Sequence, residues 1–182
     1  MQHRVDSPSH KLMVFALLVM LSAHTYGMSD NELTSWIESK SAGSPLLMAD
    51  NRVRVDINDG RVTLSGQVRL LAQSLEYERI AGNTIGVKAV ANRIRVVPES
   101  PLSDSEIEHQ VRYVMFDTYR RFWHHEMSAL ITVDDGQVSI VADLRHPRDL
   151  ETLKYRLAKI EGVTKVAINA EAATGYFFKS TK

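Results

Sequence analysis

An internal repeat is the feature that most constrains the fold of this chain. Asp59-Gly60 and Asp135-Gly136 each lie between two runs in which apolar residues alternate with polar ones. Asp-Gly between such runs is typical of a two-residue β-hairpin, because its type I′ turn needs positive φ at both central residues. A two-residue loop at Asp59-Gly60 pairs Ile57 with Val62 and puts the apolar residues of both strands on one face. We therefore predict one hairpin in each half of the chain.

Two further landmarks accompany each hairpin in the same order. A Ser-x-x-Glu pattern, typical of a helix capping box, precedes the hairpin and begins at Ser29 in the first half and at Ser103 in the second. A helical stretch follows the hairpin and ends at Gly86 or Gly162, and a valine-rich run comes next. Each half therefore predicts the order helix–strand–strand–helix–strand, and the crossover helix makes the last two strands parallel.

Length and composition agree with two small folded units. The chain has 182 residues, of which 44% are hydrophobic and 24% are charged, as is usual for globular proteins. We predict an α+β protein of two tandem α-β-β-α-β modules, each a three-stranded mixed sheet with two helices on one face. The expected parts are a first module at 28–97, a Pro-containing linker at 98–102, a diverged second module at 103–172 and a C-terminal tail at 173–182.

The first 27 residues have the pattern of an export signal. Arg4 and Lys11 precede a run of ten apolar residues, 12–21, which is shorter than the roughly 20 residues that span a membrane. Thr25 and Gly27 are small residues in the positions expected just before a cut after Gly27. We expect residues 1–27 to be a signal peptide and the protein to be periplasmic; an uncleaved anchor is the alternative.

Three stretches of the first half carry a family resemblance. They are the Ser-Asp-x-Glu helix start at 29–32, the alternating run 55–66 around its Asp-Gly turn, and the run 86–96 that begins with Gly-Val. On these stretches the unit resembles the BON domain, a small α/β module of bacterial envelope proteins. The second half is more diverged, with Ala142, Ile168 and Ala170 at matching positions that hold Gly, Asn and Ile in the first half.

The resemblance implies a function without catalysis. A signal peptide followed by two such units is similar to the osmotically inducible periplasmic proteins and to the dual-BON outer-membrane lipoproteins. The lipoproteins are anchored through a lipidated Cys, and this chain has no Cys. The family is associated with phospholipid binding and envelope integrity, and one relative with periplasmic chaperone work. The resemblance therefore implies peripheral contact with phospholipid or with an envelope protein.

The sequence carries no motif for an enzyme or a metal centre. The chain lacks cysteine thiols, and it contains neither a GxSxG nucleophile pattern nor a glycine-rich phosphate loop. The three consecutive residues 124–126, His-His-Glu, are adjacent, so their side chains diverge and rarely share one ion. The formal net charge of zero argues against general nucleic-acid binding, which needs a basic field. We expect no enzyme activity, cofactor or metal.

The first helix of the second half supplies the leading candidate site. With Ile107 and Val111 on its core side, helical spacing places an aromatic and basic stripe on the opposite side, where polar residues are usual. Rings beside arginine suit a bilayer interface; packing against the first module or a partner is the alternative. The stripe consists of Tyr113, Phe116, Arg120 and Trp123, with Arg121 at its rim.

A second candidate is a basic sheet face in the first half. Strand alternation directs five arginines away from its core: Arg52, Arg54, Arg61, Arg93 and Arg95. Such a face suits a phosphate-bearing or acidic partner, although exposed arginine is ordinarily just solvated. The matching positions in the second half carry no positive charge and include Ser128, Leu130, Gln137, Ala167 and Asn169. We expect peripheral binding of anionic phospholipid in envelope maintenance or osmotic stress, or alternatively a protein-binding chaperone or adaptor.

Overall fold

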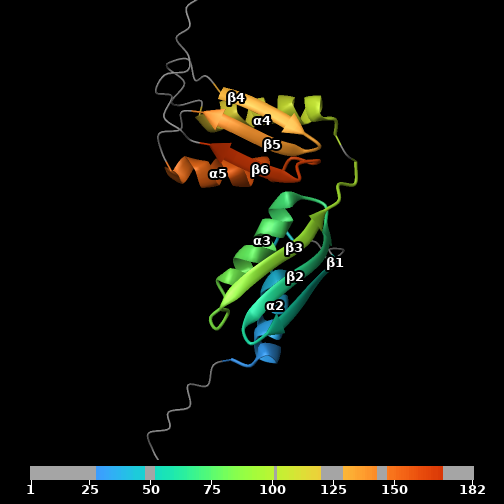
Figure 1. Ribbon diagram of the computed structural model, residues 1–182, viewed down its shortest axis with the longest axis vertical. Coiled ribbons are helices and arrows are strands. Elements are labelled where there is room, and N and C mark those ends of the chain that lie inside the picture. The colour runs from blue at the N-terminus through green and yellow to red at the C-terminus, as the bar shows by residue number, and fades with distance from the viewer. Residues whose placement is uncertain (1–27, 48–51, 101, 120–128, 143–146, 170–182) are drawn as a thin grey trace, which may run out of the picture.

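Both halves of the chain fold into an α+β unit with the predicted order of elements. The second helix of each half ends at Gly82 or Leu157, before the predicted stops at Gly86 and Gly162. The computed structural model describes residues 28–47, 52–100, 102–119, 129–142 and 147–169 (Figure 1). The proposed signal segment 1–27 and tail 173–182 lie outside the described residues. The first half consists of α2 (Asp30–Ala42), β1 (Arg52–Asn58), β2 (Arg61–Val68), α3 (Leu71–Gly82) and β3 (Ala89–Val96). The second consists of α4 (Asp104–Tyr119), β4 (Ala129–Asp134), β5 (Gln137–Ala142), α5 (Pro147–Leu157) and β6 (Lys165–Asn169).

Each half contains a three-stranded mixed sheet. The strand orders are β1-β2-β3 and β4-β5-β6, with the first pair antiparallel and the second pair parallel in both. The predicted register is confirmed, since Ile57 pairs with Val62 and Val55 with Leu64. Asp59 and Gly60 have φ of 50° and 71°, as a type I′ turn requires. The turn in the second half repeats this geometry.

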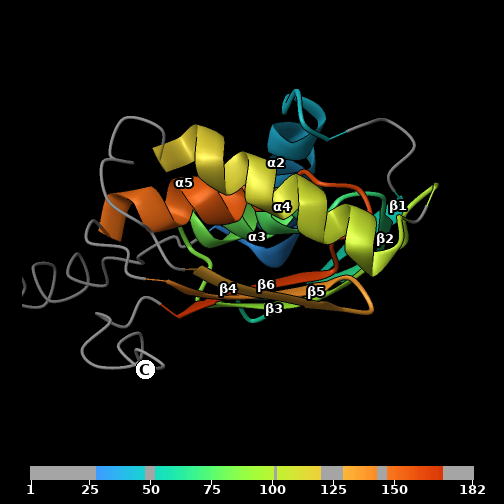
Figure 2. The same cartoon turned by 90° about the horizontal axis from the view of Figure 1, so that it is seen from above.

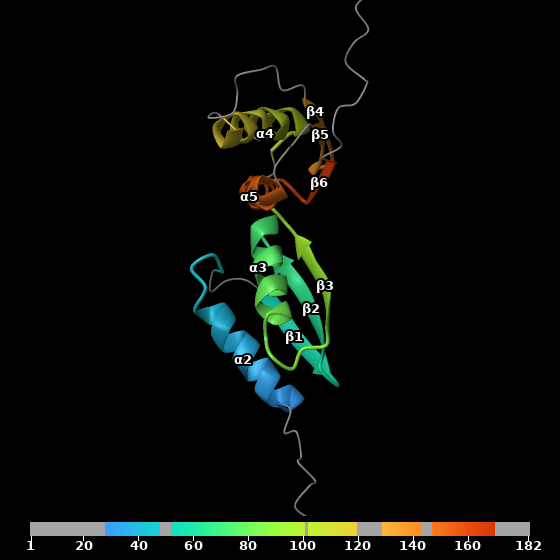
Figure 3. The same ribbon diagram turned by 90° about the vertical axis from the view of Figure 1, so that its left-hand side faces the viewer.

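Helices cover one face of each sheet and leave the other face open. Ile37 and Leu64 are among the buried residues between the first sheet and its helices, and Val111 and Ile140 occupy the same place in the second half. Two views at right angles place the helices of both halves on one side of the molecule and the strands on the other (Figures 2 and 3). The two open sheet faces therefore lie on the same side.

The first helix of each half begins with the predicted capping box. The Glu32 carboxylate accepts from the Ser29 backbone N–H at 2.7 Å, and the Glu106 carboxylate accepts from the Ser103 backbone N–H at 2.8 Å. The bonds from Ser29, above all its backbone N–H, lower the pKa of Glu32. The bonds from Ser103, above all its hydroxyl, lower the pKa of Glu106. Both boxes therefore favour the ionised carboxylate.

Acid should weaken both helix starts. A carboxyl whose pKa is lower in the folded chain contributes stability above its unfolded pKa of about 4.3, and that stability is lost as the pH falls through the folded value. We expect the urea midpoint to fall between pH 7 and about pH 3.5. The fall should be smaller in a Glu32→Gln, Glu106→Gln double variant. The matched control is Glu38→Gln, which removes an exposed carboxylate on α2 outside the capping box; an equal change in both variants would contradict the assignment.

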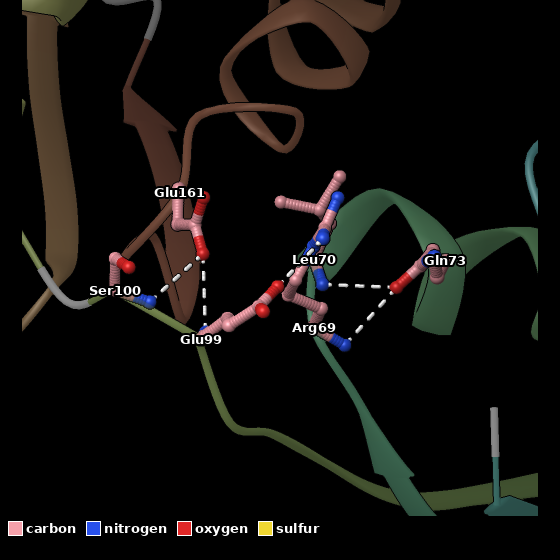
Figure 4. A network of polar contacts seen from close by, with 6 residues as sticks. All are labelled: Arg69, Leu70, Gln73, Glu99, Ser100 and Glu161. Atoms are coloured by element: carbon pink, nitrogen blue, oxygen red, sulfur yellow. Dashed lines mark hydrogen bonds and ion pairs between the residues drawn. The ribbon is translucent and has the colours of Figure 1, made fainter. Parts of the chain in front are cut away.

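The junction between the halves joins the end of one helix to the start of another. The Ala72 backbone N–H, in the first turn of α3, donates to the Ala158 carbonyl just after α5 at 2.9 Å. Leu71 packs against the core of the second half. The Glu161 carboxylate accepts from the Glu99 and Ser100 backbone N–H groups at 3.1 Å each (Figure 4). Backbone, side-chain and apolar contacts thus fix the two halves together.

Candidate functional site

The open face of the first sheet carries the arginines that alternation placed there. Arg52 and Arg54 on β1, Arg61 on β2, and Arg93 and Arg95 on β3 are all exposed. Their neighbours along each strand turn toward the helices and are more buried. The predicted outward placement of all five is therefore confirmed, while their role in binding stays a prediction.

Four of these arginines frame the uncharged residues Ser65 and Gln67 of the central strand. Across the sheet, Arg52, Gln67 and Arg95 form one row. The next row on this face consists of Arg54, Ser65 and Arg93. Because adjacent strands lie about 4.8 Å apart and each residue rises about 3.3 Å, the four arginine Cα atoms mark a rectangle of about 10 by 7 Å. Polar groups of Ser65 and Gln67 lie between the two columns of positive charge.

The charges on this face are poorly balanced. Arg54 Nε lies 2.9 Å from Asp56 Oδ1, and both side chains are exposed. None of the other four arginines forms an ion pair with any residue that the structure describes. The face therefore presents a net positive field, which is strongest at low ionic strength because exposed charges are screened by salt. Such a field attracts flat or extended anionic partners.

The structure describes only part of the predicted stripe on α4. Tyr113 and Phe116 are 68% and 49% exposed, while Met115 and, as predicted, Val111 are buried in the core of the second half. Arg120, Arg121 and Trp123 lie outside the described residues. The hydrogen bonds and apolar contact described above between the halves come from α3, α5 and the linker. The role of the stripe, in a bilayer interface or in packing, stays a prediction.

The two candidate sites lie on opposite sides of the molecule. The core side of α4 covers the second sheet, so Tyr113 and Phe116 face away from that sheet. The arginines occupy the side of the first sheet that no helix covers. Because the described helices lie on one side and the described strands on the other (Figure 2), a single flat surface cannot contact both sites at once.

The open face of the second sheet carries a small apolar patch. Leu130 is 62% exposed and Val141 is 39% exposed, and the two residues pair across β4 and β5. They hold the places of Arg54 and Ser65 in the first sheet. The patch could be predicted from the sequence only because Leu130 is next to Ile131 in a strand: if Ile131 is buried, alternation puts Leu130 on the open face.

The described residues form no candidate metal cluster, and they line a groove beside α3. They contain no group of three or more His, Asp or Glu side chains placed to hold a metal ion. A groove of about 460 Å³ between α3 and α5 is lined by Glu76, Arg79 and Tyr155 among others. The Arg79 guanidinium and the Ser44 hydroxyl both bond to Glu76, and the bond from Arg79 is the main cause of the lowered pKa of Glu76. Two charged groups of the groove, those of Glu76 and Arg79, are thus paired with each other.

Among the described helices, none combines the length and apolar composition needed to cross a bilayer.

Comparison with known families identifies the first half. A BON domain is found at residues 29–98, from the capping Ser29 to just after β3. This match does not extend to the second half. A search of curated proteins finds no match to the sequence.

Two solved structures show a distant likeness. Both are of CdsD, a structural protein of the type III secretion system of Chlamydia trachomatis. One is 16% identical, with a TM-score of 0.29, and the match covers 75% of this chain and 90% of that one. The other, the CdsD C-terminal domain, is 13% identical, with a TM-score of 0.30, and the match covers 78% of this chain and 99% of that one. At these TM-scores the likeness carries nothing about function.

Proposed function

We propose that the protein binds peripherally to anionic phospholipid in the bacterial envelope and does so through the arginine face of its BON domain. The observation that carries the proposal is the frame of Arg52, Arg54, Arg93 and Arg95 around two uncharged residues of the central strand, with one ion pair to the described residues. Guanidinium groups form forked hydrogen bonds to phosphate oxygens. A bilayer offers many phosphates in one plane, which suits arginines spread over an open sheet.

The second half is proposed to be a diverged module of the same kind. Asp104 holds the second hairpin turn through the Asp135 and Gly136 backbone N–H groups, both at 3.0 Å. Asp30 holds the first turn in the same way at 2.8 and 2.9 Å. Gly86 and Gly162 share positive φ, at 99° and 88°. Shared long-range contacts of this kind support a common origin for the two halves.

The cellular setting follows from the export pattern of residues 1–27. A cleaved signal would place the protein in the periplasm, where the arginine face could meet anionic lipid of the membranes that enclose that compartment. A role in envelope maintenance, including osmotic stress, fits a peripheral binder of this kind.

Protein binding through α4 is the second candidate function. Tyr113 is 68% exposed on the helix side of the molecule, and aromatic residues are enriched in protein interfaces. A chaperone or assembly adaptor could use this surface, since it faces away from the arginines and stays accessible when the sheet side is occupied.

Loss of two arginines should separate lipid binding from folding. Each arginine near an anionic bilayer contributes about 1 kcal/mol, so Arg93→Gln with Arg95→Gln should weaken binding about tenfold to thirtyfold at low salt. Co-sedimentation with vesicles of phosphatidylcholine and phosphatidylglycerol measures this effect, and pure phosphatidylcholine vesicles should bind little of either protein. Arg112→Gln on α4, where Arg112 pairs with Glu108 at 2.6 Å, is the matched control and should bind like wild type. Equal binding by the double variant would contradict the proposal.

A further inference from the structure

We propose that the open faces of the two sheets form one membrane-contacting surface, in which Leu130 and Val141 of the second half enter the bilayer interface while the arginines of the first half hold phosphate. This inference rests on the proposed function and adds the orientation of the protein and the residues that insert. The occupant of the whole surface is an anionic bilayer.

The apolar pair is placed to enter an interface. Leu130 and Val141 are cross-strand partners, so their side chains lie side by side on the open face. Their exposed neighbours on this face are small or uncharged: Thr132, Ser139, Ala167 and Asn169. Among the described residues of this face, the charged ones are Asp134 and Lys165, which lie at the hairpin end. The described part of the face around the pair can therefore leave water without burying a charge.

The junction holds the two faces on the same side of the molecule. The Ala72 N–H bond to the Ala158 carbonyl joins α3 to α5. Glu161 binds two backbone N–H groups of the linker, and Arg69 Nη1 lies 2.9 Å from Glu99 Oε2 (Figure 4). Two views show both sets of strands on one side with the helices behind them (Figures 2 and 3). A plane can thus reach both faces without a change of domain arrangement.

Charge and polarity together point to a bilayer as the occupant. Arginine is attracted to the phosphate layer of an anionic membrane, and aliphatic side chains gain free energy at the boundary between headgroups and acyl chains. The first face supplies five arginines against one aspartate, and the second supplies the aliphatic pair. Because the junction links the faces, binding of one raises the effective concentration of the other at the surface.

Single-site labelling tests the orientation directly. The chain has no native Cys, so Leu130→Cys and Tyr113→Cys each create one thiol for the environment-sensitive fluorophore NBD. With vesicles of phosphatidylcholine and phosphatidylglycerol, the label at position 130 should shift to the blue and lose about half or more of its quenching by aqueous iodide. The label at position 113, on the opposite side, should not respond. Thermal melting of both labelled proteins checks that the fold is intact.

A second variant measures the contribution of the apolar pair to binding. Leu130→Ser with Val141→Ser should weaken binding to the same vesicles about tenfold, and this loss should persist at high salt because it is not electrostatic. Trp36→Ser on α2 is the matched control, because Trp36 is 50% exposed on the helix side, and this variant should bind like wild type.

The possible results show separately whether the proposed orientation and the proposed lipid-binding function are correct. Suppose Arg93→Gln with Arg95→Gln weakens binding while the label at position 130 stays in water: the inference is then overturned and the proposed function stands. A response at position 113 also overturns it, because α4 would then be the contact. A blue shift at position 130 that grows with protein concentration and needs no vesicles assigns the patch to a second copy and overturns the inference. Absence of wild-type binding to any anionic vesicle removes both proposals.

Discussion

Replacing Gly136 by Val should unfold the second half of the protein while the first half stays folded. Gly136 has a φ of +71°, and a Cβ at this position would overlap the Gly162 carbonyl oxygen, which belongs to the backbone. Strain at positive φ costs of order 1–3 kcal/mol, and displacement of the Gly162 backbone adds to it, so we expect a loss of about 3 kcal/mol or more. A small unit has little stability to spare. Hydrogen exchange read by mass spectrometry should show fast exchange over residues 102–169 alone.

Substitutions at two other glycines provide comparisons for the stability loss expected of Gly136→Val. Gly60→Val should cost less, because the Cβ would meet the Gly86 carbonyl oxygen at 2.9 Å, which is a milder overlap. Gly82→Ala is the control, since nothing lies within 4 Å of its Cβ position, and alanine is favoured over glycine in a helix by about 1 kcal/mol. Slow exchange over 102–169 in the Gly136→Val protein would show that the turn geometry assigned here is wrong.

Removing the Asp30 carboxylate should destabilise the first half by about 2–3 kcal/mol. Hydrogen bonds to a charged group contribute about 1.5–3 kcal/mol, and their loss leaves the donor N–H groups without an acceptor. Asp30 is the first residue of α2, and its two oxygens accept from the Asp59 and Gly60 backbone N–H groups. The side chain thus ties the start of a helix to a turn that lies far along the chain.

Urea unfolding of Asp30→Ala measures the cost. Asn31→Ala, in the same first turn but exposed, is the matched control and should change the free energy of unfolding little. Asp30→Asn keeps one acceptor oxygen and should fall between alanine and wild type. Asp104→Ala should act in the same way on the second half, because Asp104 makes the equivalent pair of bonds. An Asp30→Ala protein as stable as its control would contradict the role given to the carboxylate.

Local patterns made most of the fold predictable from the sequence. The turn glycines, the capping boxes and strand alternation each depend on a few neighbouring residues, and the structure has all of them in place. The Asp30 contact was not predicted, because it joins residues about thirty positions apart and the Ser-Asp-x-Glu pattern points only to a cap. The crossover helix α3 was also less clear: Leu75 is only partly buried, whereas Tyr77 and Gln73 are buried.

The candidate site was predictable residue by residue but not as a surface. Alternation alone placed the five arginines outward, because one face of each strand must meet the helices. It could not show that the two open faces lie on one side, since that depends on the bond between Ala72 and Ala158 and on Glu161. Nor could it show that the stripe on α4 and the arginine face lie on opposite sides of the molecule.

Arginine modification of the unaltered protein tests the central claim most directly. Phenylglyoxal reacts with accessible guanidinium groups, and mass spectrometry reads each site with and without vesicles of phosphatidylcholine and phosphatidylglycerol. Membrane contact through the sheet face predicts that Arg52, Arg54, Arg93 and Arg95 lose reactivity on the vesicles, while Arg112 on α4 does not change. Unchanged sheet arginines together with protection of Arg120 and Arg121 would contradict it and would assign the contact to the α4 side instead.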